Sequence, residues 1–262
     1  LLQGDVGSGK TIIAIASLLI VIEKGYQGAI MVPTEVLAEQ HYKSLLRYLN
    51  PILVSVELLT GNTPQKKRKE ILSNLKNGLV DILVGTHALF EDKVTFNSLG
   101  MVVIDEQHRF GVTQRNRLLK KGDNTNLLSM TATPIPRTLA LSLYGDLDIS
   151  QITELPPGRI PINTKIISEN DLSELFKFVE GEMKNGKQAY VILPLIEDSE
   201  KMNLRSAKKI FKYLSEEIFL KSNVGLIHGK LNSDEKNNVI NSFLKNEINI
   251  LVSTTVIEVG ID

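Results

Sequence analysis

Short runs of β-branched and other apolar residues alternate along the chain with longer segments of helical periodicity. In the first part of the chain these runs cover residues 29–32, 54–58, 81–84, 101–104 and 127–130. A second series covers residues 164–167, 189–193, 224–227 and 249–252, with helical segments such as 172–184 and 234–245 between its members. Such alternation is typical of parallel strands joined by crossover helices. The pattern therefore predicts an α/β fold with a parallel sheet in each half.

Proline and glycine interrupt this alternation near the middle of the chain. Pro156, Pro157, Gly158 and Pro161 fall close together, and such residues favour turns and linkers over regular elements. We expect a first domain over residues 1–153, a linker over 154–163 and a second domain over 164–262. The length of 262 residues suffices for two ordinary domains.

A glycine-rich segment stands near the start of the chain, directly before a long apolar run. Residues 4–11 read GDVGSGKT and follow the apolar pair Leu1 and Leu2. Glycines here would allow the backbone a positive φ and bring its N–H groups close to phosphate oxygens, and the next helix would direct its positive end at the same anion. The apolar run 12–22 is predicted to be this helix, buried behind the loop and too short to span a bilayer.

Every residue of this segment is a candidate nucleotide contact, and the positive φ is expected at its three glycines. The candidates are Gly4, Asp5, Val6, Gly7, Ser8, Gly9, Lys10 and Thr11. Lys10 would bridge the outer phosphates, and Thr11 would hold Mg²⁺ through its hydroxyl. The alternative is a glycine turn followed by a solvated lysine.

The apolar run 101–104 ends abruptly in two acidic residues, Asp105 and Glu106. An Asp at the end of a strand can hold the Mg²⁺ of a nucleotide through water, and the next Glu can orient and deprotonate the water that attacks the γ-phosphate. A solvated acidic turn is the alternative. Together with the glycine-rich segment upstream, the acidic pair predicts hydrolysis of ATP and not only its binding.

Polar residues follow several other predicted strands at the point where each strand ends. They are Thr34, Gly85, Thr86, Thr131, Ala132, Thr133, His228, Thr254 and Thr255. Ligands of open α/β sheets bind at the carboxyl ends of the strands, and threonine hydroxyls and glycine N–H groups suit contacts with phosphates. Each of these positions alone could be an ordinary helix cap or turn. Their joint arrangement favours a binding edge.

Composition limits the choice of partners without selecting one. The 30 basic and 30 acidic residues cancel, so any contact with nucleic acid must be local. The basic run 66–69 is predicted to be solvated surface in preference to a DNA-facing patch, and Phe110 is equally suited to stacking on DNA and to packing. The chain has no cysteine and no recognisable secretory signal, and we expect a cytoplasmic protein without membrane contact.

These segments, in their order along the chain, resemble the motifs of superfamily 2 helicases and, among them, the RecG-type ATP-dependent DNA helicases. The resemblance covers essentially the whole chain. It rests on residues 1–11 (LLQGDVGSGKT), 33–41 (PTEVLAEQH), 85–89 (GTHAL), 105–112 (DEQHRFGV), 131–141 (TATPIPRTLAL), 155–161 (LPPGRIP), 188–200 and 253–262 (STTVIEVGID).

The resemblance implies two RecA-like P-loop NTPase lobes, with ATP and Mg²⁺ between them and branched DNA, such as stalled forks and Holliday junctions, as the partner. By position, the catalytic residues would be Lys10, Asp105, Glu106, Gln107 and His108. Thr131, Ala132 and Thr133 would link hydrolysis to the grip on DNA. The DNA backbone would be contacted by Thr34, Gly85, Thr86, His228, Thr254 and Thr255, and the nucleotide also by Gly260 and Asp262.

Two other functions remain open. The motor of a transcription-repair coupling translocase shares residues 131–138 but usually has Glu at the position of Gln107. The other is a hydrolysis-deficient nucleotide-binding or DNA-binding module. The resemblance also implies a longer protein with a wedge domain and an arginine motif, so that the second lobe here would be incomplete. We therefore expect the isolated chain to bind ATP weakly and to hydrolyse it slowly.

Overall fold

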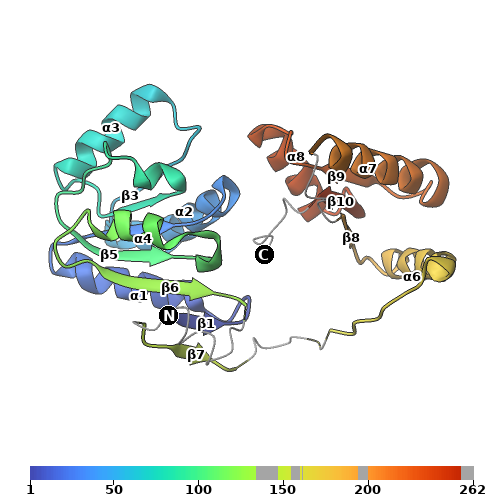
Figure 1. The fold of residues 1–262 in the computed structure, drawn as a ribbon, viewed down its shortest axis with the longest axis horizontal. Coiled ribbons are helices and arrows are strands. Elements are labelled where there is room, and N and C mark those ends of the chain that lie inside the picture. Colours follow the sequence, from blue (N-terminus) through green and yellow to red (C-terminus); the bar gives the residue numbers. More distant parts are fainter. Residues whose placement is uncertain (134–146, 155–159, 161, 194–199, 255–262) are drawn as a thin grey trace. The chain divides into compact units, whose positions relative to one another are not determined.

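The computed structural model describes residues 1–133, 147–154, 160, 162–193 and 200–254. The chain forms two compact units, Leu1–Pro161 and Ile162–Asp262 (Figure 1). Most of the expected linker, residues 155–159 and 161, lies outside the described residues, and the expected domain bounds remain a prediction.

The first unit is built on a seven-stranded parallel sheet. Its strands are β1 (Leu2–Gly4), β2 (Gln27–Met31), β3 (Val56–Leu59), β4 (Ile82–Gly85), β5 (Leu99–Ile104), β6 (Asn126–Thr131) and β7 (Ser150–Ile152). They lie in the order β3-β4-β2-β5-β6-β1-β7, and every pairing is parallel. The predicted α/β fold with a parallel sheet is confirmed.

Helices cover both faces of this sheet. They are α1 (Lys10–Glu23), α2 (Glu35–Leu49), α3 (Gln65–Lys76) and α4 (Val112–Leu119), with short 3-10 turns η1 (Asn50–Ile52), η2 (His87–Phe90) and η3 (Gln107–Arg109). Alternate strand residues face opposite sides, so that Ile30 packs with α1 and α2 whereas Met31 packs with α3 and α4. Two hydrophobic cores result, one on each face.

Helix α1 is less buried than its apolar sequence predicts. Its buried residues are Ala14, Ile15 and Leu18, whereas Ile12 is 49% exposed and Ile20 is 57% exposed. The prediction of a buried helix is wrong in this respect, because a helix that packs on a single sheet turns only one side to the core. Among the described residues, every helix falls short of the length and apolar content that crossing a membrane requires.

Strand β7 is not predicted by the hydrophobic pattern. Its three residues pair with β1, with Leu2 opposite Ser150 and Gly4 opposite Ile152. A strand this short, with two polar residues among its three, carries no periodic signal.

The second unit contains a smaller parallel sheet of β8 (Ala189–Leu193), β9 (Val224–Ile227) and β10 (Ile250–Thr254) in the order β8-β10-β9. Its helical elements are η4 (Glu169–Asp171), α6 (Leu172–Lys184), α7 (Glu200–Tyr213), η5 (Leu214–Ile218) and α8 (Ser233–Leu244). Buried Ile250 and Val252 face one core with Leu214, and Leu251 faces another with Phe243. This arrangement is again a parallel α/β layer structure.

The strand predicted over residues 164–167 is wrong. This segment has no regular structure, and its side chains are exposed, with Ile166 fully open to solvent. The β-branched residues there suit a strand, but a strand forms only where a neighbouring strand pairs with it.

Candidate functional site

The order of the sheet in the first unit gathers distant segments along one edge. In a parallel sheet all carboxyl ends point the same way. Going across the sheet from β4 to β1, these ends are followed by Thr86, Thr34, Asp105, Thr131 and the loop 4–11. The structure therefore brings together the candidates that the sequence predicts in the first unit.

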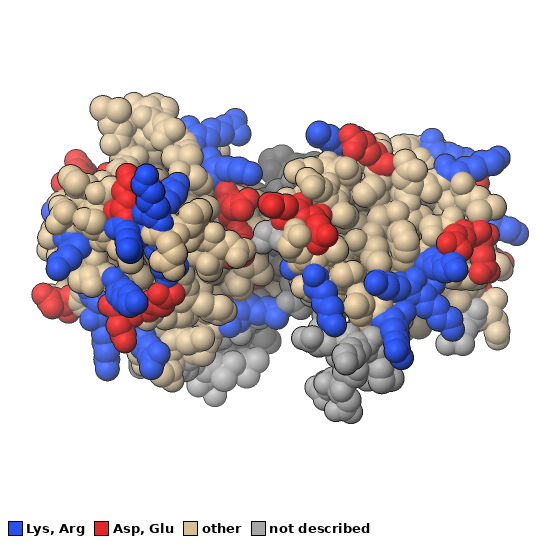
Figure 2. Space-filling view, turned by 90° about the horizontal axis from the view of Figure 1, so that it is seen from above, with Lys and Arg blue, Asp and Glu red and all other residues tan. Residues whose placement is uncertain are grey.

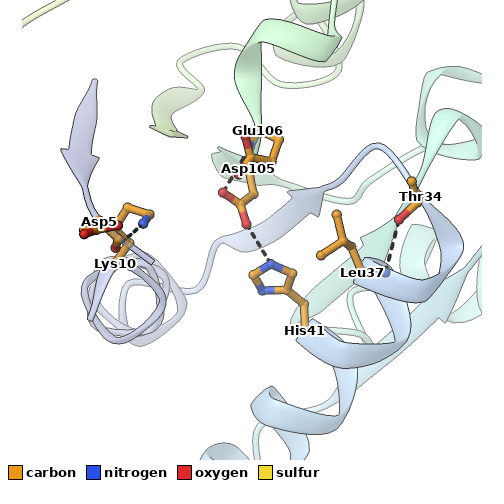
Figure 3. Close-up of polar contacts among 7 residues, drawn as sticks. All are labelled: Asp5, Lys10, Thr34, Leu37, His41, Asp105 and Glu106. Atoms are coloured by element: carbon orange, nitrogen blue, oxygen red, sulfur yellow. Dashed lines mark hydrogen bonds and ion pairs between the residues drawn. The ribbon is translucent and has the colours of Figure 1, made fainter. Parts of the chain in front are cut away.

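The glycine-rich segment forms a tight loop between β1 and α1. Gly7 has a φ of 76° and Gly9 a φ of 94°, which are left-handed values that favour glycine. The Nζ atom of Lys10 donates a hydrogen bond of 2.8 Å to the carbonyl oxygen of Asp5 (Figure 3). It donates a second bond of 2.8 Å to the carbonyl oxygen of Gly4. The lysine ammonium is thus held directly over the loop.

Gly4 is required for a different reason than the sequence indicates. Its expected positive φ is wrong, since it is not among the described residues with positive φ. A Cβ atom at Gly4 would instead lie 2.5 Å from Ser8 Oγ and 3.1 Å from Ile152 Cβ. The absence of a side chain lets β7 and the loop approach each other closely.

The loop also contains an unsatisfied polar atom. The Oγ atom of Ser8 is buried and has no hydrogen-bond partner within the described structure, although a buried hydroxyl normally has one. An acceptor such as a phosphate oxygen at the loop would satisfy it. The donor set of this loop therefore fits a phosphate group.

The acidic pair continues directly from β5. The backbone N–H of Asp105 donates to Met31 O over 3.0 Å, which fixes the end of the strand. Glu106 is only 3% exposed and has left-handed backbone angles, φ 51° and ψ 51°. For a residue other than glycine this conformation costs on the order of 1 kcal/mol or more and is concentrated at functional sites.

Asp105 has hydrogen-bond partners on both carboxylate oxygens. Its Oδ1 atom accepts the backbone N–H of Glu106 over 3.0 Å. Its Oδ2 atom lies 2.9 Å from Nε2 of His41, a residue of α2 that is 9% exposed (Figure 3). Sequence reasoning assigned no role to His41. The available signal was its position seven residues after Thr34, because residues separated by two helical turns lie on one side of a helix.

The residues that follow the acidic pair enter the turn η3. Gln107 is 3% exposed, and neither its amide nitrogen nor its amide oxygen has a partner in the described part of the chain. The side chain of His108 lies outside what the structure describes. Phe110 is 5% exposed and packs edge-on against His87 and Phe90, with ring centroids 5.8 and 6.2 Å away. Phe110 is therefore a packing residue and is not open for stacking.

The candidate DNA contacts of the first unit also have structural roles. The Oγ1 atom of Thr34 caps α2 by accepting the N–H of Leu37 over 3.3 Å. Thr86 is buried, and a Cβ atom at Gly85 would lie 2.3 Å from the carbonyl oxygen of Leu59. Capping explains the threonine at position 34, and close packing explains the glycine at position 85, whether or not either residue binds DNA.

The segment after β6 lies beside the glycine-rich loop. Thr131 Oγ1 lies 2.9 Å from Thr133 Oγ1 and accepts the backbone N–H of Thr133 over 3.2 Å. A cavity of about 340 Å³ opens at the carboxyl end of β1. It is lined by Gln3, Gly4, Asp5, Ala132, Gln151, Ile152 and Thr153. Ala132 and the loop therefore share one cavity.

Two predicted site residues lie at strand ends of the second unit. Thr254 is buried at the end of β10, and His228 directly follows β9. Burial lowers the pKa of His228, and the charge of Lys208 lowers it further. Its Nδ1 atom is buried without a partner among the described residues. The predicted sites Thr255, Gly260 and Asp262 lie outside the described residues.

The basic run at the start of α3 is mostly solvated. Lys66, Lys67 and Lys69 are exposed, whereas Arg68 forms an ion pair of 2.6 Å with Glu91 and donates to Thr60 O over 3.3 Å. On the face of the first unit in Figure 2, basic and acidic side chains are interspersed. This arrangement agrees with the predicted solvated surface.

The sequence of the first unit matches a known family of nucleotide-dependent enzymes. Residues 1–141 match the DEAD/DEAH box helicase family, and residues 169–262 match the helicase conserved C-terminal domain. The chain belongs to the DEAD/DEAH box helicase family. Its RecA-like fold class, expected from the motif resemblance, is confirmed by this membership and by the parallel sheets.

Within this helicase family the chain is similar to RecG proteins along its whole length. It is 53% identical over 262 residues to the ATP-dependent DNA helicase RecG of Bacillus subtilis and 48% identical over 262 residues to that of Thermotoga maritima. In each case all of the chain is matched, but only 38% and 34% of the relative. The resemblance to RecG-type helicases is thereby confirmed, and the chain spans about a third of the length of these relatives.

Solved helicase structures agree with this similarity. A structure of RecG bound to a three-way DNA junction is 44% identical and has a TM-score of 0.76, covering 100% of the chain and 34% of the solved chain. The helicase MrfA bound to DNA and AMPPNP is 21% identical with a TM-score of 0.72, covering 100% of the chain and 40% of its own. The second likeness concerns the fold alone.

Proposed function

We propose that the chain is the motor core of a cytoplasmic ATP-dependent DNA helicase that remodels branched DNA, including stalled forks and Holliday junctions, in recombination and repair. The observation that carries the proposal is the common sheet edge where the Lys10 loop and the Asp105–Glu106 pair lie. The RecG relatives, one of them solved on a three-way DNA junction, support branched DNA as the partner.

ATP is the proposed nucleotide, with its phosphates in the loop 4–11. The N–H groups of the loop and the amino-terminal end of α1 supply positive potential without net charge. Lys10 would exchange its hydrogen bonds with the carbonyls of Gly4 and Asp5 for bonds to phosphate oxygens. The second unit would add Gly260 and Asp262 to the nucleotide site.

Mg²⁺ is the proposed metal, held through Asp105 and Thr11. Within the described residues no group of three or more His, Cys, Asp or Glu side chains could hold a metal ion. Mg²⁺ suits such a sparse donor set, because it usually keeps several waters and binds one or two carboxylates together with the phosphates of the substrate. When bound, it would neutralise charge on the phosphates during transfer.

Glu106 is the proposed general base. A buried carboxylate beside a phosphate site is suited to orient and deprotonate the attacking water. We assign Gln107 and His108 to the coupling of hydrolysis with the movement of the motor. The unpartnered amide of Gln107 supports this role, since a second group arriving at the site would satisfy it. The link from hydrolysis to the grip on DNA would be made by Thr131, Ala132 and Thr133.

The DNA backbone would be contacted at the ends of several strands, through Thr34, Gly85, Thr86, His228, Thr254 and Thr255. The first domain would cover residues 1–153, the linker 154–163 and the second domain 164–262. Transcription-repair coupling translocases are not favoured, because the relatives at about 50% identity are RecG helicases.

ATP hydrolysis measured with and without forked DNA tests this function. We would compare the 262-residue chain with the longest natural chain that contains it. The Glu106→Gln variant of each chain would be measured beside it. We expect slow hydrolysis by the 262-residue chain, and in the longer chain a stimulation by forks that exceeds that of linear duplex and disappears in Glu106→Gln. Hydrolysis that no DNA stimulates in the longer chain would contradict the helicase function.

A further inference from the structure

The contact between His41 and Asp105 joins two elements that are distant in the sequence. His41 belongs to α2, and Asp105 follows β5, 64 residues later. Their side chains are 10% and 16% exposed, and the Nε2–Oδ2 distance is 2.9 Å. A pair this well shielded from water is more than a surface contact.

The chemistry of the pair fixes the direction of its hydrogen bond. An ionised carboxylate only accepts, so Nε2 of His41 carries the proton that it donates to Oδ2 of Asp105. The other carboxylate oxygen accepts the N–H of Glu106 over 3.0 Å. Each oxygen has more than one lone pair, so both can still face a hydrated cation. The two donors therefore set the plane of the carboxylate without consuming its binding capacity.

The helix that carries His41 is itself held firmly in place. Helix α2 begins at the Thr34 cap, and Leu37 and Leu45 anchor it in the core. Glu35 accepts a hydrogen bond of 2.6 Å from Nδ2 of Asn62, which fastens the first turn of the helix to the loop between β3 and α3. The backbone that carries His41 is therefore fixed relative to the core.

We propose that His41 is a positioning residue that orients the Asp105 carboxylate for Mg²⁺ bound with ATP. The inference rests on the proposed function, since it concerns how the proposed metal ligand is held. Groups that orient a metal ligand through hydrogen bonds typically change metal affinity or activity about 10- to 100-fold when they are removed. His41 would act through Asp105 and would not touch the metal or the nucleotide.

Two substitutions of His41 separate positioning from packing. In His41→Gln the amide nitrogen lies the same number of bonds from Cα as Nε2, so the donor to Asp105 can be retained. In His41→Asn the amide nitrogen takes the place of Nδ1 and falls short of Asp105. Both variants lose the imidazole ring, and Gln exceeds Asn by only one methylene group, so a loss due only to packing would appear in both.

The measurement is the binding of a fluorescent ATP analogue as a function of Mg²⁺ concentration. Binding is measured again in EDTA, where no Mg²⁺ is free. Thermal unfolding in EDTA is the control for folding. We expect His41→Asn to require a Mg²⁺ concentration about 10- to 100-fold higher than wild type to reach half of the Mg²⁺-dependent change in analogue binding. His41→Gln should recover most of this loss. Binding in EDTA should be the same in all three proteins.

Wild-type Mg²⁺ dependence in His41→Asn, or an equal loss in both variants, would overturn the inference but not the proposed function. A wild-type chain that fails to bind the analogue with or without Mg²⁺ would overturn the proposed nucleotide site, and the inference with it. A variant that unfolds in EDTA before nucleotide is added would assign His41 a structural role and would likewise contradict positioning.

Discussion

Glycines at the candidate site serve two different physical purposes. Gly7 and Gly9 adopt left-handed backbone angles that side chains disfavour. Gly4 and Gly85 instead lie where a Cβ atom would collide, with Ser8 Oγ in one case and with the carbonyl oxygen of Leu59 in the other. The sequence predicts that glycine is needed in the loop, but the reason at Gly4 emerges only from the pairing of β1 with β7.

The close contact at Gly85 leads to a prediction about stability. In Gly85→Ala the new Cβ atom would lie 2.3 Å from a backbone oxygen, which cannot move as a flexible side chain can. We expect the free energy of unfolding to fall by about 1–3 kcal/mol, the usual cost of overpacking. Urea unfolding measures this change. Gly111→Ala is the control, since its Cβ atom would meet nothing closer than 3.9 Å; equal stability of the two variants would contradict the account.

His228 gives a prediction about pH. Burial and the charge of Lys208 lower its pKa in the folded chain below the ordinary value of 6.5, while Glu235 opposes this and Lys236 adds to it. The unfolded chain therefore takes up the proton first, so this contribution to stability is complete above the unfolded pKa and is lost as the pH falls from there through the lower folded pKa. The effect is expected to be small because the imidazole is only partly buried.

Thermal unfolding between about pH 8 and about pH 5.5 tests this sign. The unfolding temperature of the second unit should fall less on acidification in His228→Gln than in wild type. Other ionisable groups contribute equally to both proteins and cancel in the comparison. A larger loss in the variant would show that the pKa of His228 is raised and not lowered by the fold.

At the scale of elements, helix α2 connects several parts of the site. Thr34 caps its first turn, His41 contacts Asp105 from its middle, and Leu45 and Leu49 are fully buried. The cap satisfies a backbone N–H that the helix leaves free. A residue at the start of α2 can therefore influence both the stability of the helix and the geometry of the acidic pair.

Substitutions of Thr34 separate capping from binding. Thr34→Ala removes the acceptor of the Leu37 N–H, and we expect a loss of about 0.5–2 kcal/mol in the free energy of unfolding. Thr34→Ser keeps the hydroxyl and should stay close to wild type in both stability and DNA binding. Urea unfolding and fluorescence anisotropy with labelled forked DNA measure the two effects. A loss of stability in Thr34→Ser as large as in Thr34→Ala would exclude the cap as the cause.

The hydrophobic pattern predicts most helices and strands because their buried positions recur with a regular period along the sequence. The predicted bounds of β8, β9 and α6 match those of the structure. The pattern fails where pairing decides the outcome. Three of residues 164–167 are β-branched, but within the described part of the chain they have no partner strand, whereas residues 150–152 are largely polar and pair with β1. Propensity describes a residue, and strand formation also depends on its neighbour in space.

The candidate site was predictable to the extent that each part is local in the sequence. The loop 4–11 and the pair Asp105–Glu106 are contiguous motifs, so residue order was sufficient to propose them. The contact of His41 with Asp105 depends on how β2 and β5 pair and on how α2 packs beside them. The strained backbone of Glu106 and the burial of Phe110 likewise arise only from tertiary packing.

At the scale of the whole molecule, the chain consists of two compact units with separate cores. The first unit has a seven-stranded sheet with a core on each face, while the second has a sheet of three strands. Units with their own cores can unfold independently unless a large apolar interface joins them. The smaller unit buries less apolar surface and should be the less stable one.

We therefore expect two thermal transitions, the lower belonging to the second unit. Phe243→Ala removes a buried ring from that unit and should lower only the first transition, and Leu45→Ala should lower only the second. Each substitution should cost about 2–5 kcal/mol in its own unit. Differential scanning calorimetry measures both. A single transition that both variants shift equally would contradict independent units.

The loop 4–11 and the acidic pair are proposed to form one site for ATP and Mg²⁺. Equilibrium binding of ATP in the presence of Mg²⁺ to wild type, Lys10→Ala and Lys69→Ala tests it most directly. Hydrogen bonds to charged groups contribute about 1.5–3 kcal/mol, so Lys10→Ala should bind roughly 10- to 100-fold more weakly. Lys69→Ala, which removes an exposed lysine of α3, should bind as wild type does. Wild-type affinity in Lys10→Ala would contradict the claim.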